Sequence, residues 1–160
     1  MTNRLRRWSP PVVITSCITV LAGAGVGFAR AGIQQSSADT GATQRVVDDY
    51  IGLYRRDRLE AWKALFVPGF TATYTNDDGS VTTRSLEDFY ERQRAGFERG
   101  SMSETLENVR IARVGRLAHV VADFKFTSGN TTRPGRLMLL VIAVKGEFKI
   151  AALTFTYHLS

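Results

Sequence analysis

The sequence has very little of the residue types that build thiol and metal chemistry. It contains one cysteine, Cys17, and two histidines among 160 residues. Because Cys17 lies in an apolar segment near the N-terminus, a folded domain downstream of it has no thiol for a disulfide, a nucleophile or a zinc–thiolate site. We therefore expect no metal and no cofactor.

An excess of one charge is also missing from most of the chain. The full sequence carries a net charge of +6, but four arginines and no acidic residue fall within residues 1–31. Residues 32–160 hold 17 basic and 15 acidic residues, a net charge of +2. A nearly neutral domain has no broad basic surface, which argues against nucleic acid as a partner.

Residues 1–31 have the order of a secretory signal. Three arginines among residues 4–7 precede an uncharged, largely apolar stretch over residues 8–29, and residues 29–31 (Ala-Arg-Ala) resemble a cleavage site. We predict a signal peptide and a secreted, periplasmic or other extracytoplasmic location. The alternative is a segment retained as an N-terminal membrane anchor, which is the only membrane contact that we expect. Residues 32–41 are predicted to be a linker, and residues 42–160 a single domain.

Two helical patterns open this domain. Val46, Tyr50 and Tyr54 are spaced four residues apart, which predicts a helix over residues 42–56 with one buried face. A second helical spacing of apolar residues follows and is predicted to end at Pro68–Gly69. The two helices would form a short helical hairpin.

A β-hairpin and a third helix come next. Residues 70–75 and 81–84 predict two strands joined by a turn at Gly79, a residue type that permits a positive φ. Ser85 predicts the start of a third helix, because its side chain can accept a hydrogen bond from a free backbone N–H group.

From Glu104 onward the spacing of apolar residues changes from helical to alternating. Four long strands are predicted over residues 106–114, 117–126, 137–144 and 148–159, with glycine-containing turns between them. The third of these strands is apolar on both faces and so needs a cover on each. Because the helices can cover only one face, we predict a homodimer through the sheet, with a monomer as the alternative.

Short segments at fixed places in this pattern resemble a known superfamily. They are VDDYI (residues 47–51), DRLE (57–60), DGS (78–80), SLEDFY (85–90) and KGEFKI (145–150). In order and spacing, over about residues 42–158, they resemble the nuclear transport factor 2-like superfamily, which includes SnoaL-like, ketosteroid isomerase-like and lumazine-binding-like domains. The resemblance implies an α+β fold in which a cone-shaped, curved antiparallel (mixed) sheet wraps around three N-terminal helices and encloses an apolar pocket.

The resemblance also implies a test of activity. In the ketosteroid isomerase branch, a tyrosine on the first helix and two carboxylic acids on strands move a proton and stabilise an oxyanion. Counted without gaps, the tyrosine falls on Tyr50, the general base on Tyr74 and the second acid on Leu140. Because both carboxylates are replaced, we do not expect that isomerase mechanism, and we expect a pocket without an acidic side chain.

The side chains that remain for a ligand are aromatic or apolar. A pocket of this kind with a few hydroxyl groups suits a small apolar or aromatic ligand. The candidate pocket residues are Tyr50, Tyr54, Trp62, Phe66, Tyr74, Phe89, Phe124, Met138 and Leu140. The alternative is that these side chains fill the interior and leave no pocket.

Three functions stay open at this point. The first is an exported, non-catalytic ligand-binding or interaction domain of the nuclear transport factor 2-like type. The second is a lyase, isomerase or hydrolase of the SnoaL-like type that uses the tyrosine-lined pocket. The third is a structural partner domain of an extracytoplasmic membrane complex. A carboxylate or histidine with a perturbed pKa inside the pocket would favour the enzyme, whereas a pocket of apolar groups and hydroxyls alone would favour the binding domain.

Overall fold

The structure is a computed structural model, and it describes residues 37–158, with side chains from residue 41 onward. The predicted signal over residues 1–31 lies outside the described residues. Within the described part, no helix combines the length and the apolar character needed to cross a membrane.

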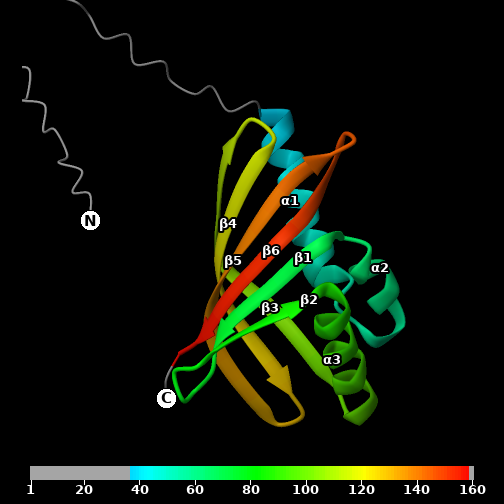
Figure 1. The fold of residues 1–160 in the computed structure, drawn as a ribbon, viewed down its shortest axis with the longest axis vertical. Helices are drawn as coiled ribbons and strands as arrows, with labels where there is room; N and C mark the ends of the chain where they lie inside the picture. Colours follow the sequence, from blue (N-terminus) through cyan, green and yellow to red (C-terminus); the bar gives the residue numbers. More distant parts are fainter. Residues whose placement is uncertain (1–36, 159–160) are drawn as a thin grey trace, which may run out of the picture. The chain divides into compact units, whose positions relative to one another are not determined.

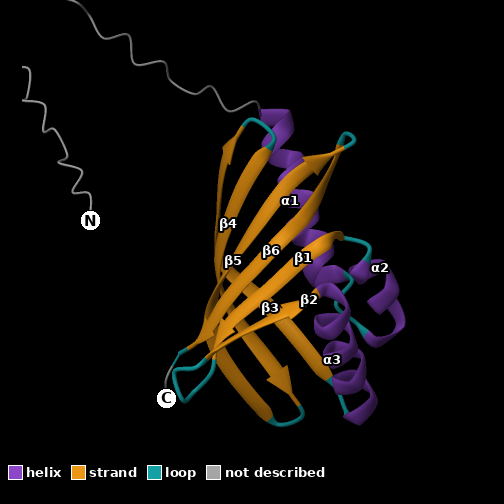
Figure 2. Ribbon diagram, viewed as in Figure 1, coloured by secondary structure: helices purple, strands orange, loops and turns teal. Residues whose placement is uncertain are grey.

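The helices form one layer against the sheet (Figures 1 and 2). They are α1 (Ser37–Gly52), a single 3-10 turn η1 (Arg56–Arg58), α2 (Leu59–Lys63) and α3 (Leu86–Arg99). Helix α1 contacts β3 and β6, whereas α3 contacts β1 and β2, so the two long helices cover different parts of the sheet. Helix α1 begins and ends about four residues earlier than predicted, and its first turns occupy the end of the predicted linker.

The sheet has six strands, drawn in orange in Figure 2. Its order is β2-β1-β6-β5-β4-β3, and every neighbouring pair is antiparallel except β1 and β6. The sheet is curved and does not close. This mixed, curved sheet with three α-helices confirms the predicted α+β fold class. The strands are β1 (Phe66–Thr75), β2 (Val81–Ser85), β3 (Met102–Val114), β4 (Leu117–Ser128), β5 (Thr131–Val144) and β6 (Glu147–Tyr157).

The predicted end of the second helix at Pro68–Gly69 is wrong. Helix α2 ends at Lys63, and β1 has already begun at Phe66. The register of β1 against β6 is interrupted between Phe66 and Thr71, so Pro68 lies in an irregular part of the strand. Proline cannot donate a ladder hydrogen bond, and a bulge is one of the places in a sheet where that loss is tolerated.

The predicted start of the third helix is confirmed. The backbone N–H of Asp88 donates to Ser85 Oγ at 3.2 Å, and Ser85 Oγ in turn donates to Asp88 Oδ2 at 2.9 Å. Gly79 has a φ of +81°, as its place in the predicted turn requires. These local signals fix where β2 ends and where α3 starts.

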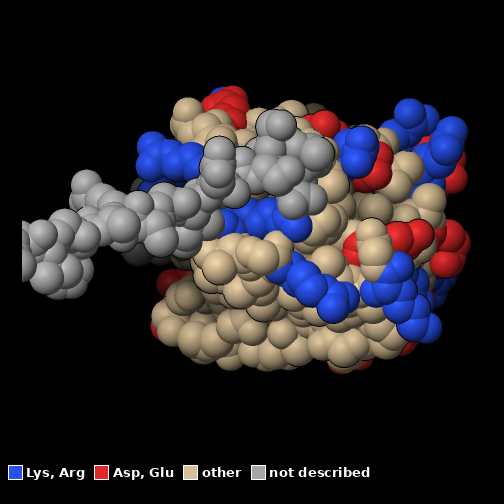
Figure 3. All heavy atoms as spheres, turned by 90° about the horizontal axis from the view of Figure 1, so that it is seen from above, with Lys and Arg blue, Asp and Glu red and all other residues tan. Residues whose placement is uncertain are grey.

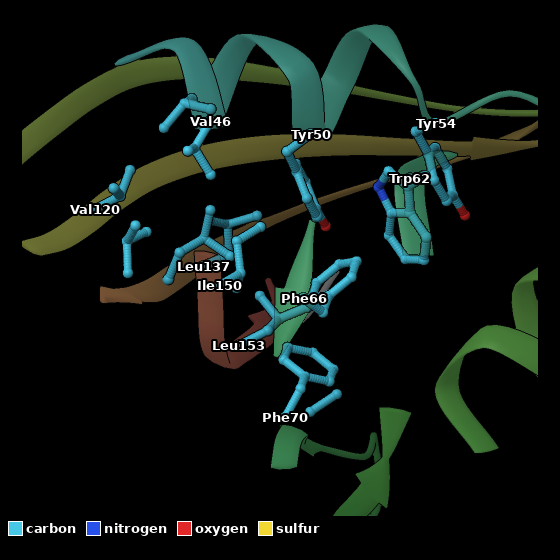
Figure 4. Close-up of a cluster of buried hydrophobic side chains, with 14 of the residues drawn as sticks. Val46, Tyr50, Tyr54, Trp62, Phe66, Phe70, Val120, Leu137, Ile150 and Leu153 are labelled. Atoms are coloured by element: carbon cyan, nitrogen blue, oxygen red, sulfur yellow. The ribbon is translucent and has the colours of Figure 1, made fainter. Parts of the chain in front are cut away.

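One end of the interior is largely aliphatic, and Thr43 of α1 is its fully buried polar residue. Val46 of α1 packs there against the inward-facing side chains of the central strands, as Figure 4 shows for Val46, Val120 and Ile150. Each of these side chains is 7% exposed or less, so this region is filled. We call it the aliphatic end and define it by Val46, Val120, Leu139, Val141 and Ile150.

The outer face of the sheet carries a different set of side chains. Val121 and Met138 are cross-strand partners on β4 and β5, and they are 36% and 43% exposed. Elsewhere on the surface acidic and basic side chains stand next to one another, as in the view from above in Figure 3. This agrees with the near-neutral charge of residues 32–160.

Candidate functional site

The end of the interior opposite the aliphatic end holds a cavity of about 450 Å³. This volume lies in the range of small-molecule sites. Its walls come from both long helices, from α2 and from all six strands. The lining residues are Tyr50, Tyr54, Trp62, Tyr74, Thr75, Asn76, Asp77, Arg84, Phe89, Arg92, Gln93, Gly96, Arg99, Met102, Glu104, Phe124, Phe126, Ser128, Arg133, Leu137, Leu153, Phe155 and Tyr157.

Aromatic rings form two opposite parts of this wall. On the helical side, Trp62 lies 5.8 Å from Tyr50 and 5.2 Å from Tyr54, measured between ring centroids. On the sheet side, Tyr74 stacks on Phe155 with centroids 4.8 Å apart. Figure 4 shows Tyr50 pointing down from α1 with Trp62 beside it. Flat aromatic walls on two sides favour a flat, largely apolar ligand.

Glu104 is an acidic side chain in the cavity wall, so the expectation of a cavity without one is wrong. It lies on β3 between Met102 and Leu106, in the alternation that points inward. The residue as a whole is half-buried, but its Oε1 atom is buried and has no hydrogen-bond partner among the described residues. A buried acceptor without a partner is costly, which makes Glu104 the most unusual polar group of the cavity.

Burial raises the pKa of the Glu104 carboxyl from 4.5 to about 7, although the hydrogen bond with the Tyr50 hydroxyl lowers it. The carboxyl group is therefore divided between its protonated and ionised forms at neutral pH. Such a group can both accept and donate a proton without a large driving force against either step. Of the functions considered from the sequence, a carboxyl group with a perturbed pKa inside the cavity favours the enzyme.

Tyrosine hydroxyls surround this carboxyl group and remain protonated. Burial, and next the negative charge of Glu104, raise the pKa of Tyr50 well above its usual value. The same two causes, in the same order, raise the pKa of Tyr157 to about 12. The hydroxyl of Tyr54 donates to Gln93 Oε1 of α3 at 2.5 Å. Tyr50 thus offers an O–H donor beside the one carboxyl group that exchanges its proton near neutrality.

A second polar atom of the cavity wall also lacks a partner. Trp62 is fully buried, and its Nε1–H group has no hydrogen-bond acceptor among the described residues. The ring is fixed between Tyr50, Tyr54, Phe66 and Phe89. The indole ring therefore closes the helical side of the cavity with a buried donor whose acceptor is not among the described residues.

Arginines line the part of the cavity nearest the solvent. Arg133 pairs with Asp77 at 2.6 Å, and its guanidinium lies 3.9 Å from the Tyr157 ring centroid. Arg84 donates from Nε to the Tyr74 hydroxyl at 2.9 Å. Two further arginines, Arg92 and Arg99, are exposed on α3. Within the described part of the chain, no group of three His, Cys, Asp or Glu side chains is placed to hold a metal ion.

Phe124 reaches the cavity because its cross-strand partner is a glycine. Gly135 lies opposite it on β5, and a Cβ atom there would come within 2.5 Å of the Phe124 ring and 2.4 Å of the Thr156 carbonyl oxygen. Any larger residue would have to move both the Phe124 ring and the backbone of β6. Gly135 therefore sets the position of one aromatic part of the wall.

Six of the nine predicted pocket residues line the cavity: Tyr50, Tyr54, Trp62, Tyr74, Phe89 and Phe124. The other three do not. Phe66 is buried behind Trp62, between that ring and Phe70. Met138 and Leu140 alternate with the buried Leu137 and Leu139 and so point to the outer face of the sheet. Placing those two inside was wrong because side chains of a strand alternate between its faces.

Glu104 was missed because the strand that carries it was predicted to start at Leu106. In the structure β3 starts at Met102, which gives Glu104 the same side of the strand as Leu106. A glutamate two residues before an inward leucine is the signal that could have found it. The cavity also includes Phe155 and Tyr157 of β6, which the sequence placed in a strand but not in the pocket.

The geometry defines a nuclear transport factor 2-like fold with an open cavity, and comparison with solved structures agrees. A protein from Novosphingobium aromaticivorans named a "putative scytalone dehydratase" matches with a TM-score of 0.62 and 19% identity, over 76% of this chain and 85% of that one. A "putative dehydratase from the NTF2-like family" of Streptomyces avermitilis matches with a TM-score of 0.62 and 11% identity, over 77% and 98%.

Other neighbours share the fold without a stated activity. An NTF2-like protein of unknown function from Shewanella baltica matches with a TM-score of 0.61 and 14% identity, over 77% of this chain and 96% of that one. No protein-family model matches the sequence, and no curated protein matches it. At these identities the similarity establishes the fold, and any activity has to be argued from the cavity itself.

Proposed function

We propose that this protein is an acid–base enzyme of the lyase or isomerase type, in which Glu104 moves a proton on a small aromatic molecule held in the cavity. The observation that carries the proposal is the Glu104 carboxyl itself: it lines a cavity of about 450 Å³, its Oε1 atom has no partner among the described residues, and its pKa is about 7. A group of this kind is unfavourable for folding, and acid–base catalysis is what such groups commonly serve.

The chemistry follows from the two polar groups that face the ligand. The ionised Glu104 carboxylate accepts a proton from a carbon next to a carbonyl group, and the electron pair of the broken C–H bond moves onto the carbonyl oxygen. Once Glu104 has taken up the proton, the Tyr50 hydroxyl, which stays protonated, leaves its hydrogen bond with that carboxyl group and donates to the carbonyl oxygen instead. Glu104 then returns the proton either to another carbon, which is an isomerisation, or to a hydroxyl group that leaves as water, which is a dehydration.

Two further observations support this reading over a cavity filled only by its own side chains. Trp62 Nε1 is a second buried polar atom without a partner among the described residues, so the residues that line the cavity leave both a donor and an acceptor unsatisfied. Two of the solved structures that share the fold carry the names "putative scytalone dehydratase" and "putative dehydratase". Dehydration is a reaction that a single carboxyl group and a hydroxyl donor can carry out.

The test is a proton-exchange assay with a matched pair of variants. The probe is an aromatic β-hydroxy ketone, the aldol product of benzaldehyde and acetone, in D₂O at neutral pH, followed by NMR. We expect the protein to catalyse deuterium incorporation next to the carbonyl group or loss of water. Glu104→Gln should lower that rate by about 100-fold or more, because the amide cannot take up the proton.

Glu107→Gln is the control, because Glu107 is exposed on the same strand and pairs with Lys125 at 2.6 Å outside the cavity. It should keep the rate within about twofold, as a change remote from the reacting atoms does. Equal rates for Glu104→Gln and the unchanged protein would contradict the proposal. Tight binding of the probe without exchange would instead favour the non-catalytic binding domain.

We also propose that the protein acts outside the cytoplasm and as a homodimer. The first point is supported by the pattern of residues 1–31, and mass spectrometry of the N-terminus of the exported protein would test it. The second is supported by the exposed apolar pair of Val121 and Met138 on the outer face of the sheet. Apolar side chains on a sheet face without a helical cover are a natural place for a second copy to pack.

A further inference from the structure

The charged groups of α3 are divided between two sides of the helix. On the side away from the cavity, Arg94 is held by two carboxylates, Glu91 at 2.5 Å and Glu98 at 2.8 Å. On the cavity side, Arg92 and Arg99 have no ion pair and no hydrogen bond with any described residue. The helix thus neutralises its outer arginine and leaves two cationic groups facing the cavity.

No carboxylate in the rest of the described cavity wall pairs with Arg92 or Arg99. Arg84, on β2, bonds the neutral Tyr74 hydroxyl rather than a carboxylate. The two acidic residues of the wall are Asp77, which already pairs with Arg133 at 2.6 Å, and Glu104, which lies among the buried rings and bonds Tyr50. Three of the four arginines of the wall therefore have no carboxylate partner within the described chain.

The positions of these groups divide the cavity into two parts with different chemistry. Tyr50, Trp62 and Phe89 are buried and aromatic, whereas Arg92 and Arg99 are exposed where the cavity meets the solvent. A ligand that satisfies both parts has a flat apolar ring at one end and an anionic group at the other. A guanidinium group presents two parallel N–H donors that match the two oxygens of a carboxylate.

We infer that the cavity binds aromatic carboxylates, with the ring between the aromatic walls and the carboxylate at Arg92 and Arg99. This inference rests on the proposed function, because it names the class of substrate on which Glu104 would act. It assigns the two halves of the substrate to separate groups: Arg92 and Arg99 hold its charge, and Glu104 remains free to move a proton at the other end. Arg84, at the same side of the cavity, is a third guanidinium within the site.

The test compares two probes that differ only in charge. Cinnamate and cinnamamide have the same ring and nearly the same shape, and isothermal titration calorimetry at pH 8 measures the affinity of each. We expect cinnamate to bind the unchanged protein at least about tenfold more tightly than cinnamamide, as a charge-assisted bidentate contact predicts. The double variant Arg92→Gln/Arg99→Gln should reduce that preference to about threefold or less, mainly by weakening cinnamate.

Arg94→Gln is the matched control, since it removes one arginine from the same helix on the side away from the cavity. It should leave the preference for cinnamate unchanged. Equal affinities for the two probes, failure of both to bind, or an equal loss in Arg94→Gln would each overturn the inference. The two proposals fail in different ways. Equal affinities for the two probes, together with a slow Glu104→Gln variant, would refute only the carboxylate site. A preference for cinnamate, together with a fully active Glu104→Gln variant, would refute only the proposed acid–base role.

Discussion

Both ends of the interior use α1 and the central strands, but they differ in their side chains: one end is packed with aliphatic residues, and the other has aromatic and polar residues around a cavity. At the aliphatic end, Val46 and Ile150 are buried among other aliphatic side chains, and the buried polar residue of α1 there is Thr43. At the other end, one α-helical turn further along, Tyr50 stands beside a carboxyl group and an open space of about 450 Å³. The first end stabilises the fold, whereas the second holds a buried carboxyl group that costs stability when it ionises. Buried ionisable groups with a shifted pKa are most often found at functional sites.

The largest expected effect on stability lies at the aliphatic end. Leu139 is fully buried there, so Leu139→Ala should lower the free energy of unfolding by about 2–5 kcal/mol, through lost burial and the cavity left behind. Its neighbour Leu140 points to the outer face and is only partly buried. Leu140→Ala should therefore cost much less, and urea unfolding of both variants measures the difference. Equal losses would mean that the two faces of β5 are not distinguished as described.

At the cavity end, burial of Glu104 should make the free energy of unfolding depend on pH. The Glu104 pKa is raised from 4.5 to about 7 in the folded protein, so the folded state holds this proton more tightly than the unfolded state. Stability is therefore greatest below pH 4.5 for this group and falls as pH rises to about 7, by up to about 3 kcal/mol in all.

Urea unfolding of the unchanged protein and of Glu104→Gln between pH 4.5 and 8 tests this sign. The difference between the two should grow in favour of the variant as pH rises, because the amide does not ionise. Glu107→Gln, at an exposed position on the same strand, should follow the unchanged protein at every pH. A constant difference between the unchanged protein and Glu104→Gln across this range would contradict the assignment.

The smallest effect on the folding of one chain is expected on the outer face. Met138 is 43% exposed, so Met138→Lys should change the stability of a single subunit by no more than about 0.5 kcal/mol. It should nevertheless dissociate the proposed homodimer, because it places a charge in the interface. Analytical ultracentrifugation of the two proteins measures this. A monomeric unchanged protein at all concentrations would contradict the dimer.

Most of the fold could be predicted from patterns along the chain, because they report local physics. The spacing of Val46 and Tyr50 predicted α1, although Tyr54 lies beyond the end of that helix at Gly52, and Ser85 predicted the start of α3. The alternating pattern that predicted a strand over residues 117–126 agrees with β4, in which Val120 is buried and Val121 is exposed. The end of α2 was misplaced because β1 contains Pro68 at a bulge, where pairing with β6 overrides the usual meaning of proline as a helix terminator.

The site was harder to predict than the fold, for two physical reasons. The start of β3 was predicted four residues too late, so Glu104 was not assigned to either face of the strand. The face of the strand decides whether a carboxyl group is solvated or buried. The pairing of Arg94 but not of Arg92 or Arg99 depends on contacts across and along α3, which charge composition alone does not resolve. Six aromatic residues could still be assigned to the cavity, because large aromatic side chains of helices and strands are usually buried in the interior.

The proposed chemistry depends on a carboxyl group of the cavity, Glu104, that exchanges its proton near neutral pH. Carbon-13 NMR of the protein labelled at its glutamate side-chain carboxyl groups, titrated between pH 3 and 9, measures this directly, and the spectrum of Glu104→Gln assigns the signal. We expect the signal that is missing from the variant to titrate with a pKa of about 7. A pKa near 4.5 for Glu104 would mean that its carboxylate is solvated, and the proposed acid–base chemistry would then have no basis.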